Sequence, residues 1–223
     1  VASGATVPIT QLCAALAVAV VVSIALLQSQ DNQITVGGFA SFVTGMLMLL
    51  APLKHLADIN GAWEAQFQPG RGAPPTARFT QLASLSDDPD PGIRYFSGTT
   101  TYRTTFDLKH PPARNSRVLL DLGRIGDVAE VKVNGQDVGT LWWAPYRTDV
   151  SAAIHAGRNT LEVRVANLWV NRLIGDAQPG ATPVTFTTMP TYRPDAPLRP
   201  SGLMGPVQLW MQSGPQSMAS RSH

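Results

Sequence analysis

The stretch LDLGRIGDVAEVKVNGQDVGTLWWAPYRTDVS, from Leu120 to Ser151, decides the fold class. Valines alternate with polar residues up to Asn134-Gly135, and apolar residues resume beyond it. Asn-Gly between alternating segments is the strongest short-range signal for a β-hairpin, because both residues tolerate the positive φ of a tight turn. The stretch therefore predicts a hairpin whose second strand ends at Trp142 and Trp143.

Three aromatic residues at the end of this hairpin need a separate explanation: Trp142, Trp143 and Tyr146. Large aromatic side chains at a strand end either cap a hydrophobic core or form a platform for a flat ligand such as a sugar ring. We favour the capping role for any one of these rings and expect at least one of the two tryptophans to be buried. All three remain candidate ligand-binding residues.

The chain from Gly61 onward consists of short alternating segments separated by Gly, Pro, Asn and Asp. Strands are predicted over 95–108, 116–123, 129–135, 136–143, 159–169, 182–189 and 205–211. Many short strands at spacings of about 8 to 12 residues, without long helices between them, are typical of an antiparallel sandwich or jelly roll. The predicted fold class is therefore mainly β, preceded by a different kind of segment.

That first segment is hydrophobic. It contains no charged residue before Asp31, and none follows until Lys54. Residues 7–28 and 34–53 are each about long enough to cross a hydrocarbon core, and they predict a helical hairpin. Buried helices of a soluble bundle are the alternative. A signal peptide is disfavoured, because the segment has no basic start and no clear small-residue cleavage site.

The hydrophobic segment carries a resemblance. PITQLCAALAVAVVVSIALLQSQDNQITVGGFASFVTGMLMLLAPLKHLADIN resembles the last two membrane helices of an ABC exporter of the lipid A flippase type. The resemblance covers about residues 3–60, and APLKHLADIN is its most specific part. No G-x-x-x-x-G-K-[ST] loop occurs in the chain, so transport activity is not predicted.

The second part of the chain carries another resemblance. Its motifs, in order, are SDDPDPGIRYFSGTTTYRTTFDL, the hairpin stretch already quoted, GRNTLEVRVANLWVNRLIGD and PSGLMGPVQL. Together they resemble the C-terminal sugar-binding-like jelly roll of family 106 α-L-rhamnosidases, which is related to the sugar-binding domain of glycoside hydrolase family 2. GAWEAQF fits the start of that module, with Trp63 at the position of its early tryptophan. The resemblance implies a galactose-binding-like β-sandwich and places the catalytic carboxylates on a separate barrel, outside the present sequence.

The two resemblances predict three regions: a hydrophobic helical hairpin over 1–60, a sugar-binding-like β-sandwich over 61–212 and a disordered tail over 213–223. The junction joins pieces that resemble two unrelated proteins. We therefore expect a chimeric chain, produced by genome rearrangement, mis-assembly or a cloned environmental (metagenomic) library.

The candidate ligand site lies in NLWVNRLIGD, and it comprises Asn167, Trp169, Asn171, Arg172 and Asp176. Sugars are bound by planar polar groups that hydrogen-bond hydroxyls, beside an aromatic face that packs on the C–H surface of the ring. These residues supply both. The alternative is a structural corner, in which Arg172 pairs with Asp176 and Asn171 holds the backbone.

Catalysis has no support from the sequence, and no catalytic residue is predicted. Asp121, Asp149 and Glu162 fit turn capping or a solvated face better than a glycosidase pair. Neither an H-E-x-x-H nor a G-x-S-x-G motif occurs. No cofactor is expected. A structural Ca²⁺ at Asp87, Asp88 and Asp90 is the alternative, although this loop lacks defined ligand spacing.

The predicted function is a non-catalytic carbohydrate-binding or accessory module derived from a rhamnosidase-like glycoside hydrolase. The alternatives are a glycoside hydrolase with an unrecognised carboxylate pair and a membrane-anchored interaction module that binds no sugar. The predicted partners are a carbohydrate and, through residues 7–53, a membrane. A net charge of +2 argues against nucleic acid, and the oligomeric state is not predicted.

The predicted location follows from the positive residues. The first ones after the hairpin are Lys54, Arg71 and Arg78, and its turn has none. Since positive residues favour the cytoplasmic side, an inserted hairpin would leave the sandwich in the cytoplasm. If the hairpin does not insert, the protein is expected to be soluble.

Overall fold

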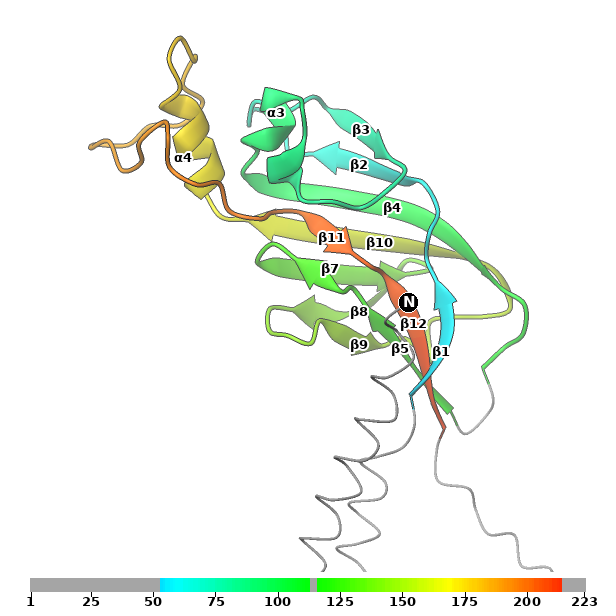
Figure 1. The fold of residues 1–223 in the computed structure, drawn as a ribbon. Helices are drawn as coiled ribbons and strands as arrows, with labels where there is room; N and C mark the ends of the chain where they lie inside the picture. The colour runs from blue at the N-terminus through cyan, green and yellow to red at the C-terminus, as the bar shows by residue number, and fades with distance from the viewer. Residues whose placement is uncertain (1–52, 113–115, 214–223) are drawn as a thin grey trace, which may run out of the picture. The chain divides into compact units, whose positions relative to one another are not determined.

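The computed structural model describes residues 53–112 and 116–213, and this part of the chain is mainly β (Figure 1). The predicted helical hairpin, apart from its last residues, and the tail from residue 214 lie outside the described residues. The strands are β1 (Leu53–Asp58), β2 (Trp63–Phe67), β3 (Thr76–Phe79), β4 (Gly98–Leu108), β5 (Ser116–Asp121), β6 (Arg124–Ile125), β7 (Val128–Val133), β8 (Gln136–Leu141), β9 (Arg147–Asp149), β10 (Gly157–Asn167), β11 (Leu203–Gly205) and β12 (Gln208–Ser213). The helices are η1 (Leu85–Asp87), α3 (Pro91–Arg94) and α4 (Val170–Asp176).

The largest sheet has six strands in the order β3-β2-β4-β10-β7-β8, all antiparallel to their neighbours. Its central strand β10 pairs with β4 along its whole length, from Gly157 opposite Leu108 to Asn167 opposite Gly98. Along β10 the apolar side chains are buried at every second position, as the alternation of the sequence predicts. The opposite face of this strand carries charged and hydroxyl side chains.

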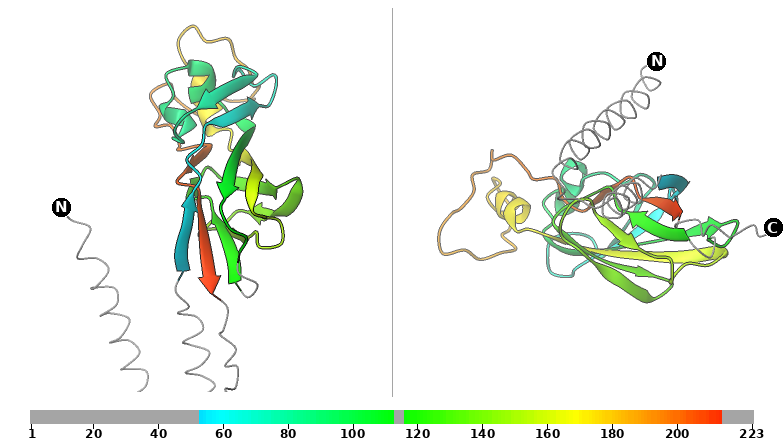
Figure 2. Two further views of the ribbon diagram at one scale, coloured as in Figure 1. Left: turned by 90° about the vertical axis from the view of Figure 1, so that its right-hand side faces the viewer. Right: turned by 90° about the horizontal axis from the view of Figure 1, so that it is seen from below.

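A second sheet has four strands in the order β1-β12-β5-β9, and β11 pairs with β6 in a small third sheet. One core cluster contains buried side chains from both larger sheets, including Trp63 and Val163 of the six-stranded sheet and Leu120 and Leu209 of the four-stranded sheet. The two views of Figure 2 show the sheets from the side and from below. The described residues therefore form a β-sandwich with a shared hydrophobic core.

The hairpin predicted at Asn134-Gly135 is confirmed. Val133 at the end of β7 pairs with Gln136 at the start of β8. The two turn residues have φ values of 51° and 79°, the left-handed region that this turn requires. The Asn134 side chain also donates to the Ala153 carbonyl oxygen at 2.8 Å, so it fixes a neighbouring loop as well as the turn.

The burial predicted for the aromatic residues after this hairpin is wrong for both tryptophans. Trp142 is 71% exposed and Trp143 is 76% exposed. Only Tyr146 packs against the core, and it is half-buried. Strand β8 ends at Leu141, so both tryptophans lie in the loop that leads to β9, beyond the edge of the core.

The strand predicted over 182–189 is also wrong. These residues lie in the long segment between α4 and β11, which has no helix or strand and extends away from the sheets (Figure 2). The Val, Thr and Phe residues of this stretch gave it a β-like composition. The backbone N–H groups of Val184 and Thr185 donate to the Asp176 side chain of α4 rather than to a neighbouring strand.

Strand β1 begins upstream of the boundary predicted between the two parts of the chain. Its residues, LKHLAD, belong to the stretch that resembles an exporter, yet they pair with β12 at one edge of the four-stranded sheet. The His55 ring meets the Trp210 ring edge-on at 5.1 Å, and Gln208 donates to Asp58 at 2.8 Å. The sandwich seen in the structure therefore includes residues 53–58.

No helix among the described residues is both long enough and apolar enough to span a membrane.

The core placement of Trp63 generates a prediction. Trp63 is 1% exposed at the start of β2, so Trp63→Ala should lower the free energy of unfolding by about 3–5 kcal/mol through lost contacts and a cavity. Urea unfolding followed by the β-sheet circular dichroism signal measures this change. The control Glu64→Ala alters the exposed neighbour on the same strand and should cost less than about 0.5 kcal/mol. A loss below about 1 kcal/mol for Trp63→Ala would contradict its place in the core.

Candidate functional site

Several loops of the six-stranded sheet meet at one of its ends. Strands β2, β8 and β10 run in the same direction, because each is separated from another of them by one antiparallel strand. Ala129 pairs with both Val165 of β10 and Leu141 of β8, so these two strands end at the same level. Segments 68–75, 142–146 and 168–202 follow these strands, and we call this region the loop end of the sheet.

Helix α4 follows β10 directly and lies at the loop end (Figure 1). Its residues Asn171, Arg172, Ile174 and Gly175 are buried. Gly175 permits close packing against Tyr95, the C-cap of α3, because a Cβ atom at this position would lie 2.5 Å from the Tyr95 Cβ atom. The helix is thus fixed on the sandwich by its buried face.

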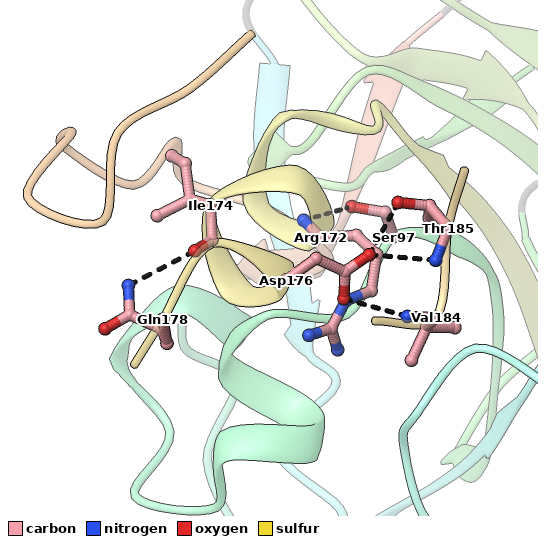
Figure 3. A network of polar contacts seen from close by, with 7 residues as sticks. All are labelled: Ser97, Arg172, Ile174, Asp176, Gln178, Val184 and Thr185. Carbon is pink, nitrogen blue, oxygen red and sulfur yellow. Dashed lines mark hydrogen bonds and ion pairs between the residues drawn. The ribbon is translucent and has the colours of Figure 1, made fainter. Parts of the chain in front are cut away.

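An ion pair within α4 fastens the long segment that follows it. The Arg172 Nε atom lies 2.9 Å from Asp176 Oδ1, and the two side chains are only 7% and 10% exposed. Asp176 also accepts from the backbone N–H groups of Val184 at 3.1 Å and Thr185 at 2.8 Å (Figure 3). Burial by itself would raise the pKa of Asp176, but the hydrogen bonds from Thr185 and Val184 and the charge of Arg172 outweigh it and lower the pKa.

The two buried asparagines of the loop end hold backbone as well. The Asn171 amide donates to the Arg199 carbonyl oxygen at 2.7 Å and accepts from the Arg199 N–H at 2.8 Å. Asn167 accepts from the Gly202 N–H at 2.6 Å and donates to the Gly98 carbonyl oxygen at 3.1 Å. These contacts have the character of the structural corner that the sequence offered as an alternative to a ligand site.

Trp169 differs from its polar neighbours, because this residue is 42% exposed. The guanidinium carbon of Arg71 lies 4.4 Å from the centre of that ring. Beside the pair is a hollow of about 460 Å³, lined by Arg71, Trp169, Leu173, Val184, Thr185, Phe186 and Thr187. The loop end thus combines an aromatic side chain, a cation and two threonines around one open cavity.

Trp169 is the one residue of this lining that the sequence prediction included, and the missed residues include Arg71 and Phe186. Arg71 lies in the Gly- and Pro-rich stretch QPGRGAPP, which reads as an irregular loop. Phe186 lies in the segment predicted as a strand. No local pattern marks either residue, because long-range strand pairing brings both of them to the loop end. Trp142 and Trp143 are exposed at the same end of the sheet.

A larger hollow of about 990 Å³ lies over the outer face of the six-stranded sheet, with Glu64, Arg103, Lys132 and Glu162 among its lining residues. Arg103 pairs there with Glu162 at 2.7 Å and donates to Gln66 at 3.0 Å. The lining includes no aromatic side chain. This hollow therefore lacks the stacking surface that a sugar ring uses.

The carboxylates weighed as a catalytic pair each have an arginine partner. The ion pairs are Asp121 with Arg147 at 2.7 Å, Asp149 with Arg117 at 2.8 Å, and Glu162 with Arg103 at 2.7 Å. Burial opposes ionisation of Asp149, but hydrogen bonds from Ser151 and Arg117 outweigh it and lower the pKa. A general acid needs a raised pKa, so the environment of Asp149 is unsuited to that role.

The acidic loop weighed for Ca²⁺ makes local hydrogen bonds. Asp90 accepts from the Gly92 N–H at 2.8 Å at the start of α3, and Asp88 accepts from the Asp90 N–H at 2.9 Å. Within the part of the chain that the structure describes, no three His, Cys, Asp or Glu residues are grouped so that they could hold a metal ion. A structural Ca²⁺ at this loop stays a prediction.

Comparison with known proteins identifies the class of the sandwich. Residues 87–194 match the family described as Glycosyl hydrolase 2 galactose-binding domain-like. Residues 87–194 of the described sandwich therefore correspond to a galactose-binding-like domain of the glycoside hydrolase type, as the resemblance in their motifs implied.

Individual relatives refine this class. A solved rhamnosidase from Novosphingobium sp. PP1Y is 53% identical with a TM-score of 0.70, and the match covers 72% of this chain and 15% of that one. A putative β-glucuronidase from Formosa agariphila is 37% identical over 179 residues, which are 68% of this chain and 15% of the relative. An ATP-dependent lipid A-core flippase from Ralstonia nicotianae is 57% identical over 60 residues, 27% of this chain and 10% of the flippase. The chain thus spans about a sixth or less of each relative, and its similarity is divided between two kinds of protein.

The Arg172–Asp176 pair generates a prediction. Asp176→Asn leaves a buried guanidinium without its counter-ion, so the free energy of unfolding should fall by about 3 kcal/mol. The lowered pKa of Asp176 means that its stabilising effect is present above the ordinary value of 3.8 and is lost as the pH falls through the folded-state value. Urea unfolding at several pH values should therefore show the difference between parent and variant shrinking below about pH 4.

The matched control is Asp195→Asn, which breaks the exposed pair of Arg193 and Asp195 and should change stability by less than about 0.5 kcal/mol. If Asp176→Asn behaved like this control at neutral pH, Asp176 would not be what fastens the segment after α4.

Proposed function

We propose that the sandwich is a non-catalytic carbohydrate-binding or accessory module of jelly-roll type, derived from a rhamnosidase-like glycoside hydrolase. The observation that carries the proposal is the half-exposed ring of Trp169 beside a 460 Å³ hollow at the loop end of a galactose-binding-like domain. The volume falls within the range of small-molecule sites, about 300–1,000 Å³.

The chemistry of the hollow supports a saccharide ligand. Its lining combines apolar side chains with Thr185 and Thr187, and the Thr185 hydroxyl donates to Asp176. A pyranose ring presents the same combination, with C–H groups on its faces and hydroxyls around its rim. The predicted polar ligands Asn167, Asn171, Arg172 and Asp176 support this site by fixing the helix and the segment around it.

The proposal treats the module as non-catalytic because glycoside hydrolysis needs two carboxyl groups facing each other across the scissile bond. Asp121 and Asp149 belong to the four-stranded sheet, whereas Glu162 lies on β10 of the other sheet. Each of them is paired with arginine, and none lines the hollow beside Trp169.

A second candidate is a membrane-anchored interaction module that binds no sugar. It is favoured by the flippase similarity and by large apolar side chains exposed in the loops after β8 and α4: Trp142, Trp143, Phe186 and Met189. Exposed apolar groups of this size are typical of surfaces that meet another macromolecule. In both candidates the hydrophobic segment predicted over 7–53, apart from Leu53 of β1, forms a membrane hairpin, and the chain is a fusion of two unrelated pieces.

The binding proposal is tested at Trp169. Trp169→Ala should abolish saccharide binding while the free energy of unfolding stays within about 1 kcal/mol of the parent, because the ring is half exposed. A glycan array identifies the ligand, and isothermal titration calorimetry with that saccharide measures the loss. The variants Trp142→Ala and Trp143→Ala show whether the hairpin end belongs to the same site.

Two results would count against this proposal. If the parent bound no saccharide on the array, the interaction module would be the better account. If Trp169→Ala unfolded the sandwich, the residue would belong to a structural corner.

The proposed topology has its own test. Lys54 follows the hydrophobic hairpin and its turn has no positive residue, so a reporter fused after the last residue should be active in the cytoplasm of a bacterial host. The fusion should be recovered in the membrane fraction. Periplasmic reporter activity would overturn the orientation, and recovery as a detergent-free soluble monomer would show that the hairpin does not insert.

A further inference from the structure

Arg71 is a cation without an acidic partner among the described residues. It lies in the segment between β2 and β3, and its side chain is held over the ring of Trp169. No carboxylate within residues 53–112 and 116–213 forms an ion pair with it, whereas the nearby Arg172 is neutralised by Asp176. Arg71 is also the one charged side chain among the described residues that line the hollow beside Trp169.

Two glycines with positive φ determine the path of the backbone on either side of Arg71. Gly70 and Gly72 flank it with φ values of 71° and 84°, which side-chain-bearing residues rarely adopt. A Cβ atom on Gly72 would lie 2.9 Å from Arg172 Nη1 and 3.3 Å from Val184 Cγ2. Glycine at position 72 therefore allows the segment to pass close to α4 and to the residues that Asp176 fastens.

A guanidinium over an indole ring keeps its hydrogen-bonding capacity. The attraction to the ring uses the positive charge, while the N–H donors lie in the guanidinium plane and remain available for an oxyanion. Carboxylates and sulfates accept two such bonds at once, and these charge-assisted bonds are stronger than bonds between neutral groups. A neutral ligand would cover the cation without compensating its lost hydration.

We propose that this hollow binds an acidic saccharide, a sugar ring whose carboxylate or sulfate group is held by Arg71. This inference rests on the proposed function and specifies the ligand class of the same site. The ring packs against Trp169 and Phe186, and the Thr187 hydroxyl hydrogen-bonds its rim. The Thr185 hydroxyl donates its proton to Asp176, so it can only accept a hydrogen bond from the ligand. Leu173 and Val184 add apolar surface near Arg71 and the acidic group of the ligand, where exclusion of water strengthens the charge interaction between the two.

The test compares acidic sugars with neutral ones of the same shape, using the full-length chain and isothermal titration calorimetry. The probes are methyl β-D-glucuronide against methyl β-D-glucoside, and galactose 6-sulfate against galactose. At least one acidic probe should bind about tenfold or more tightly than its neutral counterpart, as expected for a charge-assisted pair. The two pairs distinguish a carboxylate ligand from a sulfate ligand.

Variants assign the preference to Arg71. Arg71→Gln should remove the preference for the acidic probe, whereas Arg71→Lys, which keeps the charge without the planar fork, should retain part of it. The control Arg158→Gln removes the same charge from the opposite end of β10 and should leave binding unchanged. Thermal melting shows whether each variant is folded.

Salt dependence of the parent provides a readout that needs no variant. Affinity for the acidic probe should fall as sodium chloride rises from about 0.05 M to 0.5 M, while affinity for the neutral probe stays constant. Three results would overturn this inference and leave carbohydrate binding intact. They are equal affinity for acidic and neutral probes, a preference for the acidic probe that does not change with salt, and a preference that Arg71→Gln does not remove. Binding of none of the four probes, together with a blank glycan array, would overturn both the inference and the proposed function.

Discussion

The pairing of β10 with β4 along eleven residues is the constraint on which the rest of the structure depends. It fixes which residues of β10 face the core, since a shift by one position would move Leu161, Val163 and Val165 to the solvent side. It also fixes the level at which the neighbouring strands end. The loop end is a consequence of this register, and the elements that surround Trp169 come together there from three separate parts of the sequence.

The loop end combines buried polar contacts with exposed side chains. Buried polar contacts fasten α4 and the segment after it, because each buried amide or charged group at this corner needs a partner to offset its lost hydration. These contacts occupy the polar groups that looked most like sugar ligands. The residues left available to a ligand are Arg71, Trp169 and Phe186, whose side chains are not held by buried hydrogen bonds of this kind.

Local patterns predicted the fold well and the site only in part. The alternation of β10 and the Asn-Gly turn each encode their structure within a few residues, and both predictions were confirmed. The exposure of Trp142 and Trp143 could not be predicted, because it depends on where the opposite sheet ends relative to Leu141. The contact between Arg71 and the Trp169 ring could not be predicted either, since almost one hundred residues of sequence separate the two.

Strand β1 shows that pairing at a sheet edge depends only weakly on the side chains of the edge strand. Five of the β1 residues have ladder partners on β12, and a ladder uses backbone groups that every residue except proline can offer. LKHLAD therefore serves as an edge strand although its sequence resembles the end of an exporter helix. In the sequence, the stretch that resembles an exporter therefore overlaps the first strand of the sandwich. A ladder of backbone hydrogen bonds depends little on side-chain identity, so the edge position of β1 constrains its sequence less than the central position of β10 constrains the alternation of that strand.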